Sequence, residues 1–311
     1  MRYYAGPWRR ISIPDVNRAI EMAFAEHGRG NVQMPPKIYV TFDTGDFRTM
    51  PAYLPALGIA GVKVVNVHPL NRSGGLPTVM ALTVLLDPAT GLPQAIINAT
   101  ELTAMRTGAA GAVAAKYLSP KRRVTLGLVG TGRQAEAQVE AIAAELAIEE
   151  LKVWTRKEKH AEAFAARYPD YSARSVPIRQ ACDCDVLVTT TPSTVPVVDA
   201  AWIADGTHIN AIGADAPGKQ ELDPALLRRA EVYVDDSEQA VHSGEINVPL
   251  REGHYTPGEI AGTLGEVVIG MKRRSSSGAV TIFDSTGIAV QDLAIAAVAM
   301  RHADGIDLPF P

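Results

Sequence analysis

Three cationic side chains lie in largely apolar surroundings in the first third of the chain. Arg48 lies in GDFRTMP, Lys63 alternates with Val62 and Val64 in GVKVVN, and Arg106 lies in MRTGAA, which is expected to be the start of a helix. A charged side chain in an apolar strand is costly unless it is paired or used in function. Arginine binds carboxylates through two parallel hydrogen bonds, and lysine can carry a proton. Each residue alone is as well explained by a structural ion pair, but together they indicate a site for a small carboxylic acid.

A glycine-rich turn follows the apolar segment VTLGLV. It reads GTGRQA, from Gly130 to Ala135, and a helical pattern begins directly after it. In the G-x-G-x-x-A fingerprint, Gly130 permits a tight turn, Gly132 lets a pyrophosphate approach the backbone, and Ala135 allows close packing of helix on strand. A plain turn between a strand and a helix is the alternative. The strand before, the helix after and a second strand further on favour a dinucleotide site.

The end of the second strand bears on the choice between NAD and NADP. NAD sites usually place Asp or Glu there to bind the ribose 2′-hydroxyl. Here Thr155 is followed by Arg156 and Lys157. A carboxylate would repel a 2′-phosphate that these cations can bind, so the sequence favours NADP(H) over NAD(H). Alternatively, Arg156 and Lys157 merely begin a solvated helix.

The first part of the chain is rich in short segments with the pattern of β-strands. Between Lys37 and Ala99 these are KIYVTF, FRTMPAYL, GVKVVNV, PTVMALTVLL and QAIINA, separated by turn residues. This pattern predicts a mostly antiparallel sheet. We expect a helix over Ile13–Glu26 before the sheet and another over Glu101–Tyr117 after it, with small residues packing closely around Gly108 and Gly111.

Strands alternate with helices from about Arg122 onward. The expected strands are VTLGLVG, LKVWT, DVLVTTT, HINAIG, EVYVD and TIFDSTG, with helices over Gln134–Ala147, Lys157–Tyr168 and about Ile288 to His302. Alternation predicts a parallel sheet. We therefore expect an α/β protein with a Rossmann-type doubly wound parallel sheet over residues 119–285. Residues 1–118 and 286–311 are expected to form an α+β domain with a mostly antiparallel sheet.

Bulk composition excludes several classes of function. The 311 residues carry 30 Lys+Arg and 34 Asp+Glu, a formal net charge of −4, and no basic patch that would indicate nucleic-acid binding. No apolar run has the length of a membrane span, and no apolar segment follows the charged N-terminus, so we expect a cytoplasmic protein. The two cysteines, Cys182 and Cys184, are expected to be reduced thiols, although a strained disulfide is the alternative. Too few Cys and His residues surround them for a metal site.

The motifs resemble those of the ornithine cyclodeaminase/mu-crystallin family, and in particular its branch of archaeal-type alanine dehydrogenases. The matching segments run nearly end to end: MPPKIYV, FRTMPAYL, VNVHP, GLPTVMAL, MRTGAAGAVAAKYL, GTGRQA, DVLVTTTPS, THINAIGADAPGKQELD, HSGEINV and FDSTGIAVQD. The resemblance implies a homodimer in which the antiparallel domain binds substrate and forms the interface. It also implies a small amino-acid or imino/oxo-acid substrate.

Several residue roles follow from this resemblance. Arg48, Lys63 and Arg106 match the family's carboxylate-binding and acid/base residues, with Lys63 as proton donor and acceptor. Asp215 matches the catalytic aspartate. Cofactor contacts are implied for Arg106, Gly130, Gly132, Arg133, Gln134, Thr155, Arg156, Lys157, Pro192, Ser193, Thr194, Asp215 and Ser285. His68 is expected to orient the strand of Lys63, and Glu245 to act as a supporting carboxylate; neither is counted as catalytic.

Asp215 has two interpretations. It ends the expected strand HINAIGA, at the carboxyl edge where parallel sheets bind ligands. A carboxylate there can activate water or stabilise an iminium. Alternatively, it caps a helix that begins after Pro217.

The predicted activity is reversible oxidative deamination of a small L-amino acid such as alanine. One rival is a ketimine or pyrroline-2-carboxylate reductase, or an ornithine cyclodeaminase. Asp215 argues against the mu-crystallin type, and a 2′-phosphate site would be unusual for a cyclodeaminase. A second rival function is that of a non-enzymatic NADPH-dependent binding protein. The retention of Lys63, Arg106 and Asp215 argues against it. The sequence departs from the family at Thr155, where an acid is usual, and at the N-terminus MRYYAGPWRR, which replaces a longer first strand and helix.

Overall fold

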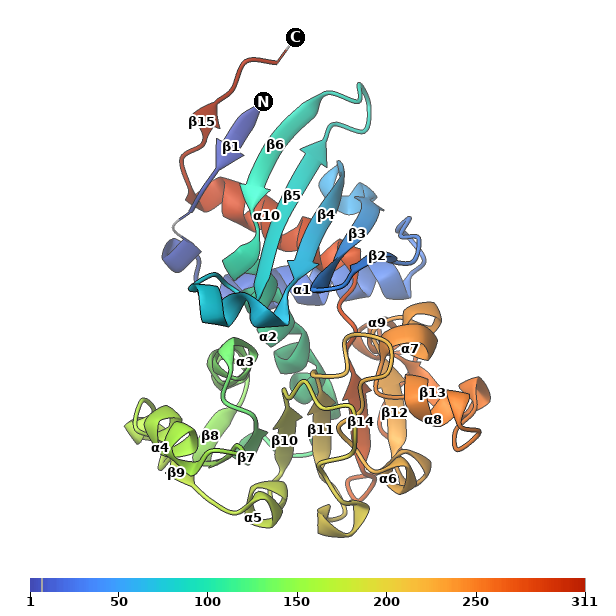
Figure 1. Ribbon diagram of the computed structural model, residues 1–311. Helices are drawn as coiled ribbons and strands as arrows, with labels where there is room; N and C mark the ends of the chain where they lie inside the picture. Colours follow the sequence, from blue (N-terminus) through green and yellow to red (C-terminus); the bar gives the residue numbers. More distant parts are fainter. Residues whose placement is uncertain (7, 311) are drawn as a thin grey trace. The chain divides into compact units, whose positions relative to one another are not determined.

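The computed structural model describes residues 1–6 and 8–310. They form two compact units, each built around its own sheet (Figure 1). Unit 1 comprises Met1–Arg106 with Ile288–Pro311, and unit 2 comprises Thr107–Gly287. The helix α2 (Thr100–Leu118) therefore begins in unit 1 and ends in unit 2, whereas the sequence placed the domain boundary after it.

Unit 1 contains a seven-stranded sheet in the order β15-β1-β6-β5-β4-β3-β2. All neighbouring strands are antiparallel except β1 and β6, so the predicted mostly antiparallel sheet is confirmed. The divergent N-terminus supplies β1, which inserts between β6 and β15. The strands are β1 (Arg2–Tyr4), β2 (Ile38–Phe42), β3 (Gly45–Leu54), β4 (Ile59–Val67), β5 (Val79–Leu86), β6 (Pro93–Asn98) and β15 (Ile306–Asp307).

Two long helices of unit 1, α1 (Ile13–Gly28) and α10 (Ala289–His302), pack together, and α10 also packs on β3, β4 and β5. The helix α1 begins as predicted, because Ser12 accepts a hydrogen bond from the backbone N–H of Asp15 and Pro14 lies in the first turn. Short 3-10 helices connect the other elements: η1 (Trp8–Arg10), η2 (Pro55–Leu57) and η3 (Pro69–Gly74).

The opposite face of the unit 1 sheet is apolar and partly exposed. Ile38 and Val40 on β2 are 61% and 41% exposed, and Leu82 on β5 is 48% exposed. Cross-strand pairing places Val64 opposite Leu82 and Thr49 opposite both Ile38 and Val64, so these side chains share one face. A contiguous apolar face of this kind is typical of an interaction surface.

Unit 2 contains an eight-stranded sheet in the order β13-β12-β14-β11-β10-β7-β8-β9, in which every neighbouring pair is parallel. The predicted Rossmann-type sheet is confirmed. The strand order reverses between β7 and β10, and such a reversal is where open α/β sheets bind dinucleotides. The strands are β7 (Arg123–Val129), β8 (Ala147–Trp154), β9 (Arg174–Ser175), β10 (Val186–Thr189), β11 (His208–Ala211), β12 (Glu231–Val234), β13 (Ile260–Thr263) and β14 (Thr281–Asp284).

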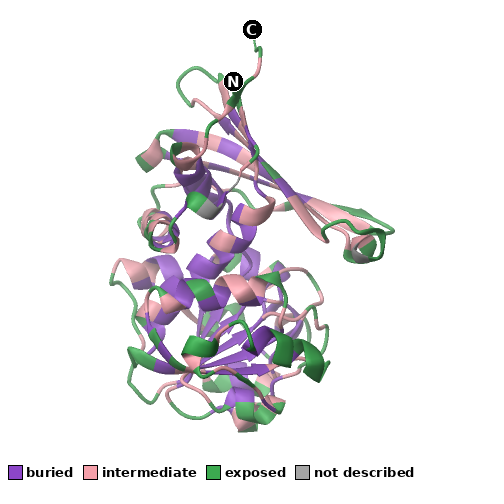
Figure 2. Cartoon of the chain, turned by 90° about the vertical axis from the view of Figure 1, so that its left-hand side faces the viewer, coloured by how far each residue is buried: buried purple, intermediate pink, exposed green. Residues whose placement is uncertain are grey.

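Helices cover this sheet, and its central strands β7, β10, β11, β12 and β14 are largely buried (Figure 2). The helices that belong wholly to unit 2 are α3 (Arg133–Ala143), α4 (Glu158–Ala165), α5 (Ile178–Cys182), α6 (Pro224–Arg229), α7 (Ser237–Ser243), α8 (Asn247–Arg251) and α9 (Leu264–Val268). Its 3-10 helices are η4 (Pro169–Tyr171), η5 (Ala200–Trp202) and η6 (Pro257–Glu259). Over residues 1–6 and 8–310, no helix has the length and apolarity needed to cross a membrane.

Two helix ends were predicted wrongly. The helix expected over Lys157–Tyr168 is α4, which ends at Ala165. The helix expected over Gln134–Ala147 ends at Ala143, and Ala147 already begins β8. The backbone N–H of Ala147 donates to the carbonyl of Arg122, the residue just before β7, so strand pairing overrides the helical propensity of the segment. Four short strands, β1, β9, β13 and β15, were also not expected, because their sequences, RYY, RS, IAGT and ID, lack a clear hydrophobic pattern.

The close packing predicted around two glycines of α2 is confirmed. A Cβ atom on Gly108 would lie 2.3 Å from the backbone carbonyl oxygen of Ala137 in α3. A Cβ atom on Gly111 would lie 2.0 Å from the side-chain oxygen of Gln138, whose amide nitrogen donates to the carbonyl of Thr107 at 2.8 Å. The two helices approach at these glycines because no side chain intervenes.

Replacing Gly108 with alanine should therefore destabilise the protein. Alanine favours a helix over glycine by about 1 kcal/mol, but the new methyl group meets backbone that cannot rotate away, and overpacking costs roughly 1–3 kcal/mol. We expect a lower melting temperature by differential scanning calorimetry for Gly108→Ala. Gly258→Ala is the matched control, since a Cβ atom there meets nothing within 4 Å. Equal melting temperatures for the two variants would contradict the close approach.

Candidate functional site

Lys63 and Arg48 share the buried face of the unit 1 sheet. Lys63 on β4 pairs with Met50 on β3, and Arg48 pairs with Val65, so the two cations lie two residues apart along neighbouring strands. Their exposed fractions are only 1% and 5%. Alternate residues of each strand point to this buried face, so the two cations are buried together with the apolar residues beside them.

Lys63 has a buried partner that the sequence did not reveal. Its Nζ donates to Oδ1 of Asp292 on α10 at 2.6 Å, and Asp292 is 3% exposed. Burial and the positive charge of Arg106 lower the pKa of Lys63, the charge of Asp292 partly offsets both, and the resulting pKa is about 7. Lys63 can therefore exchange a proton near neutral pH. The feature of the sequence that could have indicated this partner is Asp292, a single acidic residue within the largely apolar segment IAVQDLAIAAVA.

Arg106 is hydrogen-bonded to the same carboxylate, that of Asp292. Its Nε donates to Oδ1 of Asp292 at 3.1 Å, and its Nη1 donates to Oε1 of Gln291 at 3.1 Å. Arg106 lies in the second turn of α2 and not at the start of a helix. The structure thus brings together Lys63 and Arg106 through one carboxylate.

Arg48 is held by different groups. Its Nε donates to Oδ1 of Asp46 at 2.7 Å, and its guanidinium lies 5.1 Å from the centre of the Tyr39 ring. His68, which follows β4, stacks on Phe42 with ring centres 6.0 Å apart. Neither contact involves Lys63.

The glycine-rich turn of unit 2 has the features that a pyrophosphate site requires. Gly130 has a positive φ of 111°, and a Cβ atom there would lie 2.6 Å from Oγ1 of Thr190, after β10. A Cβ atom on Gly132 would meet nothing within 4 Å, so the backbone is open at the start of α3. Ala135 is fully buried. The side-chain oxygen of Gln134 is buried without a hydrogen-bond partner among the described residues. These observations fit a dinucleotide phosphate at the helix N-terminus.

Two unpaired cations follow β8, which ends at Trp154. Arg156 and Lys157 are exposed, and within the described ranges neither forms an ion pair. Thr155 is partly buried, and Lys157 is the backbone N-cap of α4 without a side-chain capping bond. Arg133, the first residue of α3, is exposed as well. This end of the sheet therefore presents cations that are free to bind an anion.

Asp215 lies in the loop after β11, four residues beyond Ala211, and not at the strand end that the sequence predicted. Its Oδ1 accepts a hydrogen bond from Nζ of Lys219 at 2.5 Å. The next helix begins at Pro224 and is capped by Asp223. The alternative interpretation of Asp215 as a helix cap after Pro217 is therefore wrong.

A buried carboxylate joins the two loops that follow β10 and β11. Glu221 is fully buried and accepts hydrogen bonds from the backbone N–H groups of Thr191 at 2.5 Å and Gly213 at 2.8 Å, and from Oγ1 of Thr189 at 2.7 Å. Burial raises the pKa of Glu221, and these hydrogen bonds partly oppose the shift. The loop containing Pro192, Ser193 and Thr194 and the loop containing Asp215 are thus fixed to one side chain.

Two further carboxylates extend this support. Glu245 accepts from the backbone N–H groups of Glu221 and Leu222, and Asp284 accepts from the N–H of Glu245 at 2.8 Å. Burial and the nearby charge of Glu221 raise the pKa of Glu245 well above its usual value. The supporting role expected for Glu245 is consistent with these contacts. Ser285, directly after β14, has a buried hydroxyl without a partner among the described residues.

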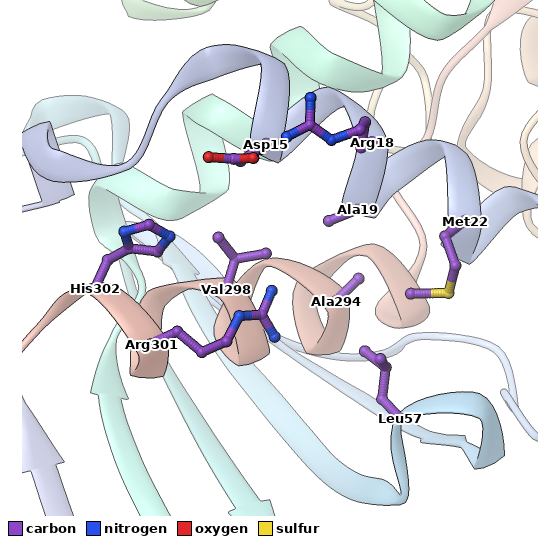
Figure 3. A pocket seen from close by; sticks show the side chains of 9 residues that line it. All are labelled: Asp15, Arg18, Ala19, Met22, Leu57, Ala294, Val298, Arg301 and His302. Carbon is purple, nitrogen blue, oxygen red and sulfur yellow. Dashed lines mark hydrogen bonds and ion pairs between the residues drawn. The ribbon is translucent and has the colours of Figure 1, made fainter.

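A cavity of about 300 Å³ lies between α1 and α10 (Figure 3). Its charged lining comes from Asp15, Arg18, Arg301 and His302, and its apolar lining includes Met22 and Val298. None of the residues predicted to bind substrate or cofactor lines it. Asp15 and Arg18 are already paired with each other, so the cavity is not assigned to the site.

Known proteins resemble the chain over nearly its whole length. The family model for the ornithine cyclodeaminase/mu-crystallin family matches residues 9–305. An alanine dehydrogenase of Archaeoglobus fulgidus is 50% identical over 296 residues, which cover 94% of this chain and 91% of the relative.

Two solved structures share the fold. A dimeric archaeal alanine dehydrogenase with bound NAD has a TM-score of 0.94 and 46% identity, covering 99% of both chains. A Thermococcus litoralis Δ(1)-pyrroline-2-carboxylate reductase, in complex with NADH and L-proline, has a TM-score of 0.93 and 34% identity, covering 99% of this chain and 100% of the other. The match extends through both units and all the motifs that carry the predicted site. The chain is therefore an oxidoreductase that belongs to the ornithine cyclodeaminase/mu-crystallin family.

Proposed function

We propose that this protein is an NADP(H)-preferring dehydrogenase of a small L-amino acid such as alanine. In the oxidative direction, the amino acid, water and NADP⁺ yield a 2-oxo acid, ammonium, NADPH and a proton. The observation that carries the proposal is the buried Lys63, whose pKa is about 7 and whose Nζ lies 2.6 Å from Asp292. A base that titrates near neutral pH, accompanied by arginines, suits an amino acid that must be held by its carboxylate and deprotonated at nitrogen.

Each residue has a distinct role in the proposed reaction. Arg48 and Arg106 bind the carboxylate, and neutral Lys63 accepts a proton from the substrate ammonium. A bound nicotinamide would supply the acceptor for the hydride from Cα. Asp215 then assists the attack of water on the iminium carbon by accepting a proton. Lys219, paired with Asp215, orients its carboxylate.

The dinucleotide is proposed to bind unit 2 by its glycine-rich turn. Arg133 and Gln134 contact the pyrophosphate, while Thr155, Arg156 and Lys157 bind the adenosine ribose and its 2′-phosphate. Further contacts come from Gly130, Gly132, Arg106, Pro192, Ser193, Thr194, Asp215 and Ser285. The support for NADP(H) is the pair of exposed, unpaired cations after β8; the two solved relatives above were determined with NAD and NADH.

We further propose that the protein forms a homodimer through the apolar face of the unit 1 sheet. Ile38, Val40 and Leu82 remain exposed on that face, and a second copy would cover them. The archaeal alanine dehydrogenase relative is a dimer.

A second candidate function is reduction of a cyclic imine. It is favoured by the structural similarity to the pyrroline-2-carboxylate reductase, and it would use the same cations to hold the carboxylate. Ammonia is required as a substrate only by the amino-acid dehydrogenase, which distinguishes the two activities.

A substrate panel with both cofactors tests the function. We expect oxidation of L-alanine and ammonia-dependent reduction of pyruvate, with NADP(H) preferred by roughly tenfold or more in kcat/KM, because charge-assisted contacts contribute about 1.5–3 kcal/mol. The variant Arg156→Ala/Lys157→Ala should lose this preference, whereas Lys159→Ala, a nearby exposed cation, should keep it. Turnover of pyrroline-2-carboxylate but not of alanine would favour the second candidate, and equal kcat/KM values for NADPH and NADH would refute the cofactor assignment.

The pH dependence tests Lys63. Lys63 accepts a proton only when neutral, so kcat/KM for amino-acid oxidation should rise as the pH increases through about 7. In the reductive direction the protonated lysine is needed, and the rate should fall over the same range. Lys63→Met should abolish turnover in both directions. Steady-state rates from pH 5.5 to 9 that show no ionisation near 7 would count against this role.

The variant Asp215→Asn tests the aspartate. It keeps the size of the side chain but removes its basicity and charge, so kcat should fall by roughly 10²–10⁴, the range for an acid–base residue. Asp199→Asn is the matched control, because Asp199 only caps η5 and asparagine caps a helix nearly as well. Normal turnover of Asp215→Asn would exclude the proposed mechanism.

A further inference from the structure

The first turn of α10 places two polar side chains next to each other in the interior of unit 1. Gln291 is fully buried, and Asp292 is 3% exposed. Each uses one of its two polar atoms to bind a cation: Asp292 Oδ1 accepts from Lys63 and Arg106, and Gln291 Oε1 accepts from Arg106. Because a guanidinium can only donate, the last contact fixes the orientation of the Gln291 amide.

The other polar atom of each side chain is unsatisfied. Asp292 Oδ2 and Gln291 Nε2 are buried and have no hydrogen-bond partner among the residues that the structure describes. Leaving a buried polar group unpaired costs about 1–3 kcal/mol, and such groups in a native protein call for an explanation. Two unsatisfied polar atoms on consecutive residues, close to two cations, indicate that a bound ligand supplies the missing hydrogen bonds.

The chemistry of the two atoms restricts that ligand. Oδ2 of an ionised aspartate only accepts hydrogen bonds, and Nε2 of glutamine only donates them. The ligand must therefore offer an N–H or O–H donor close to an oxygen acceptor. An α-amino acid carries both, on its amino group and its carboxylate, which are separated by a single carbon.

We propose that Gln291 and Asp292 form the subsite for the head group of an α-amino acid, with Asp292 Oδ2 accepting from the substrate nitrogen and Gln291 Nε2 donating to the substrate carboxylate. This inference rests on the proposed function and extends it. Asp292 then has two roles, since Oδ1 holds Lys63 and Arg106 while Oδ2 holds the nitrogen on which positive charge develops during oxidation. The subsite recognises what all α-amino acids share, so side-chain specificity is set by other residues.

Binding measurements on two ligands test the assignment. The dissociation constants of L-alanine and of propionate, which lacks the amino group, are measured by calorimetry. The enzyme is saturated with NADPH, because L-alanine does not react with the reduced cofactor. Asp292→Asn should weaken L-alanine binding by at least about tenfold, because a charge-assisted hydrogen bond is lost. Propionate should bind equally well or more tightly, because the variant removes a negative charge near the carboxylate. Loss of packing alone would weaken both ligands alike.

Gln291→Glu provides a second, independent test that keeps the size of the side chain, the acceptor for Arg106 and the Lys63–Asp292 pair. It replaces the donor to the carboxylate with an oxygen that repels it, so L-alanine and propionate should both bind several-fold more weakly, by a similar factor. Asp15→Asn, on α1 outside the subsite, is the control and should bind both ligands like the wild type.

The outcomes separate the two proposals. A wild-type enzyme that turns over neither amino acids nor cyclic imines would refute the proposed function, and the subsite with it. An active wild type whose Asp292→Asn variant weakens both ligands equally, or neither, would refute the subsite alone. If Asp292→Asn does not fold, unchanged propionate binding by Gln291→Glu would overturn the proposal by itself.

Discussion

The buried carboxylate of Asp292 forms the interaction on which the proposed substrate site in unit 1 depends. Lys63 and Arg106 both donate to its Oδ1, at 2.6 and 3.1 Å. Removing one partner from a buried ion pair costs about 3–5 kcal/mol, since it leaves an uncompensated charge. Asp292 therefore allows two cations to be buried close together, and it holds the pKa of Lys63 near 7, where burial and Arg106 alone would lower it further.

Unit 2 uses carboxylates in a different way. Glu221, Glu245 and Asp284 bind backbone N–H groups in succession, from the end of β14 to the loops after β10 and β11. Backbone donors at loop starts have no partners within the sheet, and these acids supply them. The loops that carry Asp215 and Ser193 are thereby held by buried side chains, although both loops are at the surface. In both units, then, buried acids other than the proposed acid–base residues determine where the reactive groups lie.

Hydrophobic patterning was sufficient to predict most of the fold. The five long strands of unit 1 and the alternating strands of unit 2 were predicted because each shows a clear hydrophobic pattern. Short strands such as β9 and β13 were missed, since their existence depends on a neighbouring strand with free hydrogen-bonding groups. The helix expected up to Ala147 was shortened for the same reason: strand pairing with β7 outweighed local propensity.

The sequence by itself determined which residues are candidates for the proposed chemistry. Lys63 was recognisable as a charge on an apolar strand, and Gly130 and Gly132 as a turn between a strand and a helix. The tertiary structure alone decided what these residues touch. Asp292 is 229 positions from Lys63 in the chain, and their contact exists only because the C-terminal helix packs on β4. Likewise, Asp215 was predicted to end a strand, but hydrogen bonds from Gly213 and Thr191 to Glu221 fix the shape of the loop that contains it. The local sequence pattern predicts the secondary structure and the burial of a residue. Its contacts with residues distant in the chain depend on how the elements pack together.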